Sequence, residues 1–322
     1  MSAANVWALI LAAGEGSRLR GLTTTPGGFS VPKQFCSLQG GASLLEETLW
    51  RAESVAERRH MVTVVAAQHR RWWEGLLWFA EPENVIVQPE NKGTAPGLLL
   101  PLLHILRRDP NATVVVLPSD HFVRNESVLA RGLQQASRLA RVDNQHVYLL
   151  GLVPDEIDPE LGYILPADGA VMAAASVRQF IEKPSADVAR DLVQDGALWN
   201  VFILAASARA LLSLYASRYP SLVANMSLAV ESDGDSSVDA NAARALYPQL
   251  PTLDFSRDVL QGQESRLRVL TVPACGWSDL GTPRRVAETL NRITTKPDTA
   301  YAPIHTAYLS LAAQHSRQHH TT

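Results

Sequence analysis

Short apolar runs alternate with longer segments of helical period along the first half of the chain. The apolar runs predict strands at 6–13, 61–67, 84–89, 113–120 and 146–154. The segments between them predict helices at 43–59, 70–79, 94–108 and 125–141. Continuously apolar strands are typical of parallel sheets covered on both faces, and strand–helix alternation predicts right-handed crossovers. Thr94 is the expected N-cap of its helix, with Pro96 tolerated in the first turn.

The pattern changes after Pro154, where connections become shorter. Strand-like pieces follow at "GYILPA", "SVRQFIEK", "WNVFILAA" and 266–274, and helices are expected at 185–195, 207–217 and 283–293. We therefore predict an α/β fold, a Rossmann-like three-layer α/β/α arrangement around a mixed, mainly parallel sheet. One domain over 1–294 would have two halves, 1–154 and 155–294. Residues 231–239 are expected to form a solvated loop, and 295–322 a polar tail with room for a short helix.

Composition describes an ordinary soluble protein. Its 322 residues are 46% hydrophobic and 19% charged, and a net charge of −3 gives no global attraction to nucleic acid or acidic membranes. Cys36 and Cys275 lie far apart without metal-type spacing, so we expect reduced thiols and a cytoplasmic setting. No Lys or Arg precedes the first apolar run, which is interpreted as a buried strand rather than a signal peptide, and no run approaches the ~20 residues that span a bilayer. Neither nucleic acid nor a membrane is an expected partner.

The first candidate for chemistry is "ILAAGEGSRLRGL" (10–22), here called the glycine loop. It is not a dinucleotide fingerprint, because Leu19 stands where the third glycine belongs, and it lacks the Lys of a Walker A loop after Gly21. Gly14 and Gly16 would let backbone N–H groups approach an anion, and Arg18 suits bidentate phosphate contact. The alternative is a tight strand-to-helix turn with a surface arginine.

Three further charged residues follow strand-like runs or a proline. Lys33, after Pro32, presents a point charge, unless it is simply a solvated lysine. Asp120 and Asp279 each follow a strand, where an aspartate also occurs as an ordinary turn residue. Since parallel sheets bind ligands beyond the carboxyl ends of their strands, the two carboxylates could share one hard cation, Mg²⁺. The neighbouring His121 is interpreted as structural rather than as a general base.

Another polar group lies in the second half. Glu182 and Asn200 suit sugar hydroxyls and Lys183 suits a second phosphate. A surface ion pair or a hydrogen-bonded turn amide is the alternative interpretation of each.

In this order, the segments resemble those of the sugar-1-phosphate nucleotidyltransferases, and among them most of all the guanylyltransferases that act on mannose-1-phosphate. The resemblance covers roughly residues 6 to 293. It rests on "LAAGEGSRL", "PKQF", "QPENKGTAP", "LPSDH", "LGYI", "FIEKP", "WN" and "WSDLGTP".

The resemblance implies a role for each matching residue. It implies a catalytic set of Arg18, Lys33, Asp120, Lys183 and Asp279, with Mg²⁺ held by Asp120 and Asp279. The implied nucleotide-binding residues are Leu11, Ala12, Ala13, Gly14, Glu15, Gly16, Arg18, Lys33, Gln88, Lys92, Gly93, Thr94, Ser119 and Asp120. The implied sugar-phosphate residues are Gly162, Tyr163, Glu182, Lys183 and Asn200. A phosphate oxygen of the sugar-1-phosphate would attack the α-phosphorus of a nucleotide, GTP in this branch, releasing pyrophosphate and an NDP-sugar.

The sequence departs from the family pattern at three places. Gly21 replaces the usual proline, an extra stretch lies between Thr23 and Pro32, and "VF" follows "WN" where many relatives carry Ser-Gly. The stretch after residue 295 is too short for the isomerase domain that the long form of the family carries. Other sugars or nucleotides, a catalytically silent regulatory homologue and a homodimer all stay open. A dinucleotide-dependent oxidoreductase is disfavoured by Leu19 and by the lack of an acidic residue at the end of the second strand.

Overall fold

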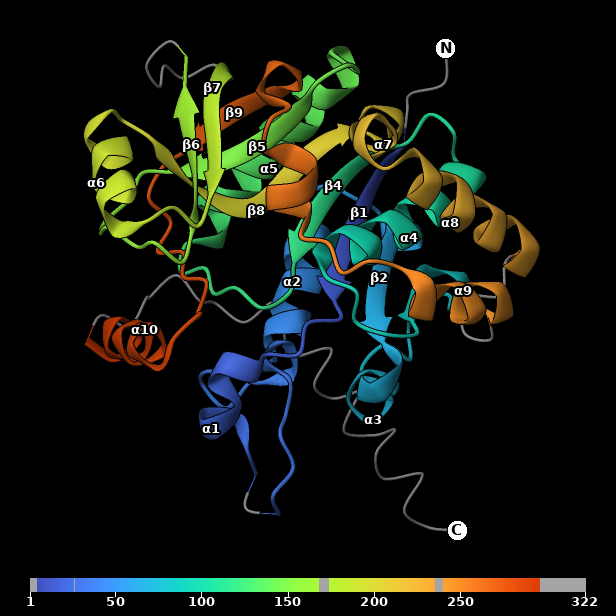
Figure 1. Cartoon of the computed structure of the whole chain (residues 1–322). Coiled ribbons are helices and arrows are strands. Elements are labelled where there is room, and N and C mark those ends of the chain that lie inside the picture. Colours follow the sequence, from blue (N-terminus) through green and yellow to red (C-terminus); the bar gives the residue numbers. More distant parts are fainter. Residues whose placement is uncertain (1–4, 26, 168–173, 235–239, 296–322) are drawn as a thin grey trace.

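One nine-stranded sheet runs through the protein (Figure 1). The computed structural model describes residues 5–25, 27–167, 174–234 and 240–295. The strand order is β3-β2-β1-β4-β8-β5-β9-β7-β6. The strands are β1 (Val6–Ala12), β2 (Met61–Ala66), β3 (Val85–Gln88), β4 (Thr113–Pro118), β5 (Val147–Leu152), β6 (Gly162–Pro166), β7 (Ala175–Glu182), β8 (Leu198–Ser207) and β9 (Leu267–Val272).

The strand directions confirm the mixed, mainly parallel sheet. β1 pairs in parallel with β2 and β4, with Ala8 opposite both Met61 and Val115. β2 and β3 are parallel, as are β5 and β9. In the described part of the chain only β7 and β8 run against the other strands, since every pairing that is antiparallel involves one of these two.

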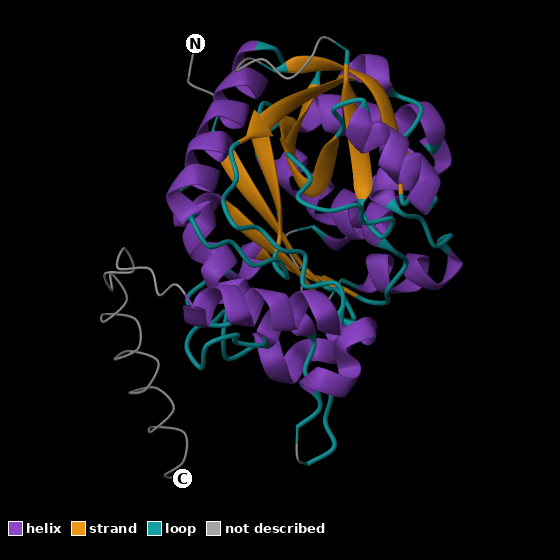
Figure 2. Cartoon of the chain, turned by 90° about the vertical axis from the view of Figure 1, so that its left-hand side faces the viewer, coloured by secondary structure: helices purple, strands orange, loops and turns teal. Residues whose placement is uncertain are grey.

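Helices cover both faces of the sheet, as Figure 2 shows. They are α1 (Arg20–Thr23), α2 (Leu44–Ala52), α3 (Arg70–Trp73), α4 (Thr94–Arg108), α5 (Glu126–Val142), α6 (Ala186–Gln194), α7 (Ala208–Arg218), α8 (Pro220–Asp233), α9 (Asn241–Leu246) and α10 (Pro283–Thr295). Trp7 and Leu9 of β1 pack into the core that α4, α7 and α8 cover. Ala8 and Ile10 pack into the core under α2 and α5. This alternation confirms the three-layer α/β/α class.

Three predicted boundaries were wrong. The helix expected at 43–59 ends at Ala52, and the one expected at 70–79 is the single turn α3, followed by turns around Gly75, a poor helix residue. Gly93, not Thr94, is the N-cap of α4. The Thr94 hydroxyl is instead used to bind the 253–255 segment, described below.

Helices α8 and α9 were not predicted. α8 extends to Asp233 into the segment expected as a loop at 231–239, of which 235–239 lie outside the described residues. Its apolar and polar residues are poorly segregated, so it gave no clear helical period. The predicted tail at 295–322 also lies outside the described residues, apart from its first residue, where α10 ends.

β8 positions the site because two strands share one of its edges. β4 pairs along Leu204–Ser207 and β6 pairs along Leu198–Asn200. The carboxyl end of β4 and the amino end of β6 therefore meet beside the middle of β8, and a cleft opens there.

Cys36 and Cys275 are both free thiols. Within the described ranges, no helix combines the length and the hydropathy required to cross a membrane.

Candidate active site

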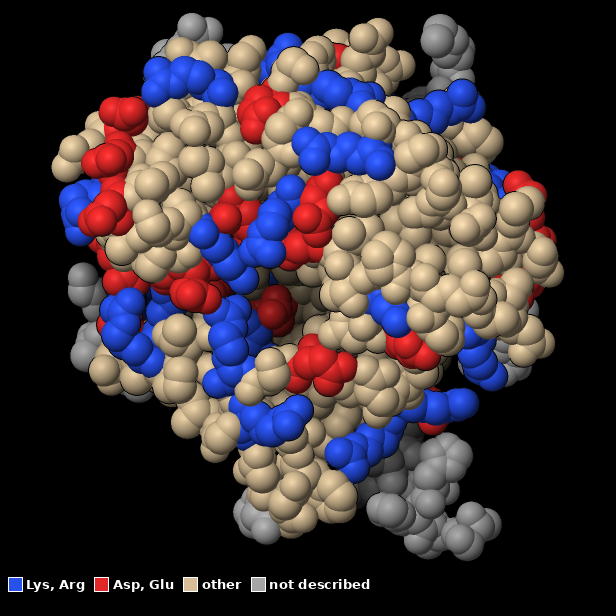
Figure 3. Space-filling model, viewed as in Figure 1, with Lys and Arg blue, Asp and Glu red and all other residues tan. Residues whose placement is uncertain are grey.

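A cleft of about 500 Å³ lies over the ends of β1, β3, β4 and β7 and the middle of β8. Figure 3 shows a hollow on this face, with acidic residues on its walls and basic residues at its rim. The predicted site residues that line the cleft are Leu11, Ala13, Gly14, Arg18, Gln88, Gly93, Thr94, Ser119, Asp120, Gly162, Glu182, Asn200 and Asp279. Residues from both halves of the chain thus face one cavity, as the strand-end argument predicts.

The glycine loop is shaped by the "PKQF" segment. Gly16 has a φ of 60°, and a Cβ there would lie 2.9 Å from the backbone nitrogen of Lys33. The buried side chain of Gln34 donates hydrogen bonds to the carbonyls of Ala12 and Gly14. Gly14 itself has open space around its Cα. Gly16 is therefore required by packing, whereas Gly14 leaves the cleft open to a ligand.

Lys33 links the two aspartates at the bottom of the cleft. Its Nζ lies 2.8 Å from Oδ2 of Asp120 and donates a hydrogen bond of 2.7 Å to the carbonyl of Asp279. Burial by itself would raise the pKa of Asp120, but nearby charge and hydrogen bonds, led by the Lys33 ammonium, together hold this pKa below its usual value. The structure thus brings the three residues together, with Lys33 turned toward the aspartates.

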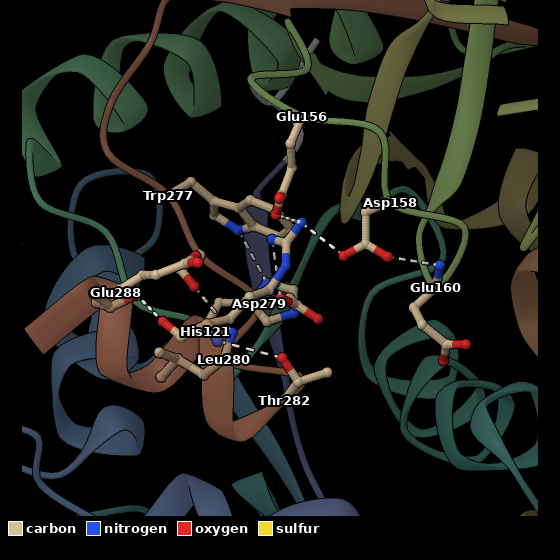
Figure 4. A network of polar contacts seen from close by, with 12 residues as sticks. His121, Glu156, Asp158, Glu160, Trp277, Asp279, Leu280, Thr282 and Glu288 are labelled. Carbon is tan, nitrogen blue, oxygen red and sulfur yellow. Dashed lines mark hydrogen bonds and ion pairs between the residues drawn. The ribbon is translucent and has the colours of Figure 1, made fainter. Parts of the chain in front are cut away.

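His121 stands beside Asp120 as a neutral imidazole. Burial lowers the pKa of His121 to about 4. The indole N–H of Trp277 donates to Nδ1 at 3.2 Å (Figure 4), so the ring proton is on Nε2, 3.6 Å from Oδ1 of Asp120. A group that stays neutral and fixed in this way supports the structural interpretation of His121.

One wall of the cleft is built by residues 92–95 and 253–255, which are hydrogen-bonded to each other. Ala95 N–H donates to the carbonyl of Leu253, and Leu253 N–H donates to the carbonyl of Lys92. The Thr94 hydroxyl accepts from Phe255 N–H at 2.7 Å and donates to Asp254 at 3.4 Å. The 92–95 turn is therefore held in shape from outside its own helix.

The middle of β8 bulges where it lines the cleft. The register against β5 shifts between Leu149, opposite Leu204, and Gly151, opposite Asn200. Phe202 adopts a φ of 58°, rare for a residue other than glycine, and its N–H donates to Oδ1 of Asn200. The Asn200 amide also donates to Ser256, so both ends of this side chain have protein partners.

Glu182 points into the cleft with one unsatisfied oxygen. Its Oε2 is buried without a hydrogen-bond partner, and a Cβ on Gly162 would overlap it. Burial, and secondly the charge of Asp254, raise the pKa of Glu182 to about 7. A carboxylate held in this way is ready to accept a hydroxyl donor.

Seven predicted residues do not line the cleft. Ala12 and Tyr163 are core residues, Gly16 and Lys33 lie behind the wall, and Glu15 lies near His69 and Gln68. Lys92 contacts the Pro248 carbonyl and Glu90. Lys183 is exposed at the end of β7, with a φ of 50°. Of these, only Lys33 touches a residue at the bottom of the cleft.

Several cleft residues were missed by sequence reasoning. They are Gln34, Asn91, Glu160, Phe202, Thr252, Leu253, Asp254 and Trp277. Gln34, Asn91 and Trp277 lie within the motifs that carry the family resemblance, but no role was predicted for them. Asp254 and its neighbours carried no signal, because their place depends on pairing with residues 92–95, about 160 positions away.

Asp120 and Asp279 fit a magnesium ion only together with a substrate. The described residues include no group of three His, Cys, Asp or Glu side chains that could hold a metal. Mg²⁺ is commonly bound by one or two carboxylates plus substrate phosphates and water, which is the donor set this cleft offers. Asp120 would have to exchange its contact with Lys33 for the metal.

Comparison with known proteins agrees with this geometry. The nucleotidyl transferase family matches residues 7–296. The chain belongs to this family.

The curated relatives of this nucleotidyl transferase include mannose-1-phosphate guanylyltransferases. The mannose-1-phosphate guanylyltransferase of Klebsiella pneumoniae is 27% identical over 281 residues, which is 85% of this chain and 57% of that protein. The enzyme of the same name from Escherichia coli K12 is 30% identical over 209 residues, 62% of this chain and 42% of that protein. The chain thus spans about half the length of the curated relatives it matches.

A solved structure shares the fold. It is the crystal structure of "mannose-1-phosphate geranyltransferase" from Thermus thermophilus, with a TM-score of 0.74, 24% identity, and coverage of 86% of this chain and 76% of that chain.

The Glu182 carboxyl should make the stability of this nucleotidyl transferase depend on pH. Its pKa of about 7 lies above the ordinary value of 4.5, so the folded state loses stability as pH rises from about 4.5 to 7. Glu182→Gln should then be more stable than wild type by about 2 kcal/mol at pH 8, and the difference should vanish at pH 4.5. Denaturant unfolding at both pH values measures this, with exposed Glu81→Gln as the control. Equal stability of E182Q and wild type at pH 8 would contradict the burial argument.

Proposed function

We propose that the protein transfers a guanylyl group from GTP to mannose-1-phosphate in a Mg²⁺-dependent reaction that yields GDP-mannose and pyrophosphate. The observation that carries the proposal is that one cleft joins three parts: the glycine loop, the Asp120–Asp279 pair, and the sugar-side wall with Glu182. The names of the curated relatives support the same substrates.

The residues would divide the work by position. Gly14 and Arg18 at the mouth would bind the triphosphate, and the 88–94 wall would hold the base. Glu182 would accept a hydrogen bond from a sugar hydroxyl. The reaction requires the attacking phosphate oxygen to be placed in line with the bond to pyrophosphate, and positioning plus charge neutralisation supply most of such catalysis.

Mg²⁺ would be held by Asp120 and Asp279, and it would neutralise charge on the transferring phosphate. Lys33 lies against both aspartates and would move its ammonium toward phosphate once Asp120 is engaged. Gly16 packs against the backbone of Lys33, so this backbone lies beside the glycine loop.

Substrate choice is the open part of the proposal. Phe202 stands in the cleft wall where many relatives have glycine, and its ring packs on buried Phe255 with 5.8 Å between centroids. A bulky ring there changes the shape of the wall beside Asn200. A different sugar-1-phosphate is therefore the second candidate substrate.

Pyrophosphate release tests the proposal. The purified protein is assayed with Mg²⁺ across a grid of four nucleoside triphosphates and several sugar-1-phosphates. We expect release with GTP and mannose-1-phosphate to exceed every other combination. Release with another pair would correct the substrates and keep the reaction. No release in any combination would overturn the transferase proposal in favour of a regulatory homologue.

A further inference from the structure

Arg285 is a buried arginine on α10 that meets three carboxylates at the edge of the cleft. Its NH1 donates to Oδ1 of Asp279 at 3.3 Å. Its NH2 lies 2.7 Å from Oδ2 of Asp158 and 2.9 Å from Oε1 of Glu156, as ion pairs. The guanidinium also lies 5.1 Å from the ring of Trp199. Figure 4 shows Glu156, Asp158 and Asp279 converging from different segments.

Burial and additional hydrogen bonds hold this cluster in a defined arrangement. The Arg285 side chain is only 6% exposed, and a charge that is buried so deeply requires paired partners. Asp158 is itself held, because its N–H donates to the hydroxyl of Tyr163 and that hydroxyl donates to the Asp158 carbonyl. Arg285 thus joins Asp279 to a fixed point in the sugar-side half.

The partners of Arg285 come from two loops that both serve the cleft. Glu156 and Asp158 lie in the connection between β5 and β6, which leads directly to Gly162. Asp279 lies in the connection between β9 and α10. Its other oxygen, Oδ2, lies over Gly281, where a Cβ would overlap it. Arg285 therefore holds one oxygen of the Asp279 carboxylate, and the absence of a Cβ at position 281 leaves room for the other.

We propose that Arg285 is a positioning residue, which fixes the direction of the Asp279 carboxylate and couples it to the 155–161 loop. This inference rests on the proposed function, in which Asp279 holds Mg²⁺ with the nucleotide. Arg285 touches no substrate; it acts through Asp279. The orientation of the metal-binding oxygen and the position of the sugar-side wall are thus set by one side chain.

The adjacent Arg284 provides a matched control. It lies on the same turn of α10, with a side chain that is 59% exposed, and pairs with Glu156 and Glu288. Arg284 thus shares Glu156 with Arg285, but of the two arginines it is Arg285 that pairs with Asp279. Arg284→Met and Arg285→Met therefore remove the same charge from adjacent positions, and only the second removes the Asp279 contact.

Isothermal titration calorimetry measures the affinity for GTP once in the presence of Mn²⁺ and once in EDTA. The ratio of the two affinities is the metal-dependent gain in nucleotide affinity. We expect Arg285→Met to reduce the wild-type gain at least fivefold, and Arg284→Met to change it less than twofold. In an Asp279→Asn background, Arg285→Met should produce little further change, because its effect passes through Asp279. Lys at position 285 keeps the charge but not the planar fork, so Arg285→Lys should recover the gain only in part.

Some results would contradict the proposed function, and others would contradict the positioning role of Arg285 alone. Wild-type protein that does not bind GTP, or binds it equally in Mn²⁺ and EDTA, would overturn the proposed function and the inference with it. A normal wild-type gain that persists in folded Arg285→Met would overturn the positioning role alone. If Arg285→Met reduced the metal-dependent gain equally in the wild-type and in the Asp279→Asn background, the positioning role would also be overturned. If Arg285→Met does not fold, Arg285→Lys decides, since a full wild-type gain in that variant would contradict the need for the fork.

Discussion

Asp120→Asn and Asp279→Asn should each lower kcat by about 100- to 1000-fold while leaving the fold intact. The amide keeps the size of each side chain and removes its charge. Both carboxylates lie at the bottom of the cleft, where they would hold the cation against the transferring phosphate. Because charge neutralisation dominates phosphoryl-type transfer, the loss should fall on kcat more than on substrate affinity.

Both variants should remain folded. Lys33 is 8% exposed and loses its ion pair in Asp120→Asn, but it keeps the hydrogen bond to the Asp279 carbonyl in both variants. In Asp279→Asn, the buried Arg285 keeps Glu156 and Asp158. Each variant should therefore lose about 1–3 kcal/mol of unfolding free energy, which would leave a folded protein.

Steady-state pyrophosphate release and thermal unfolding, measured on the same samples, separate the two effects. Asp187→Asn, at an exposed position on α6, serves as the control and should behave as wild type. A near-normal rate in either Asp120→Asn or Asp279→Asn would refute the shared-cation assignment.

The strands were predicted well because their signal is local. Several of the buried strands are nearly continuous apolar runs, and β1 to β5 and β9 lie within the predicted ranges. α4 and α5 were equally clear. The failures came where tertiary contacts decide: α8 lies against α4 and α7 without a distinct apolar stripe, and α3 stops after one turn.

The site was predicted only as far as sequence motifs reach. The motifs placed Asp120, Asp279, Glu182 and the glycine loop at strand ends, and the structure brings them to one cleft. Neither the direction of a side chain nor a long-range pair is readable from the chain. The contact of Lys33 with Asp120, across 87 positions (120 − 33), depends on how two loops meet.

Two more features of the site could not be predicted from the sequence, because they also depend on contacts between distant segments. The bulge at Phe202 depends on β4 and β6 sharing an edge of β8. The Arg285 cluster needs the β5–β6 loop and the loop before α10 to converge on the first turn of α10.

Gly93→Ala should be the most damaging small substitution in the base-side wall. Gly93 has a φ of 84° and a ψ of 179°, a conformation that is nearly restricted to glycine. A Cβ there would also overlap the carbonyl of Leu253, which is held by Ala95 N–H. Backbone strain and the clash together should cost about 3–4 kcal/mol of unfolding free energy.

The same substitution should weaken nucleotide binding selectively. Relief of the clash requires the 92–95 turn to separate from Leu253, which moves the wall proposed to hold the base and leaves Glu182 in place. The KM for the nucleotide should therefore rise about tenfold or more, whereas the KM for the sugar-1-phosphate should change little.

Gly196→Ala is the control for placing alanine at a glycine with a positive φ. Gly196 has a similar φ of 83°, but its Cα faces open space. Gly196→Ala should cost only about 1–2 kcal/mol, with nucleotide KM unchanged. The excess loss in Gly93→Ala then measures the cost of its extended ψ together with its packing against Leu253, a contact that no local property of the sequence reveals. Equal stability losses in the two variants, with equal nucleotide KM, would mean that this packing does not shape the base-side wall.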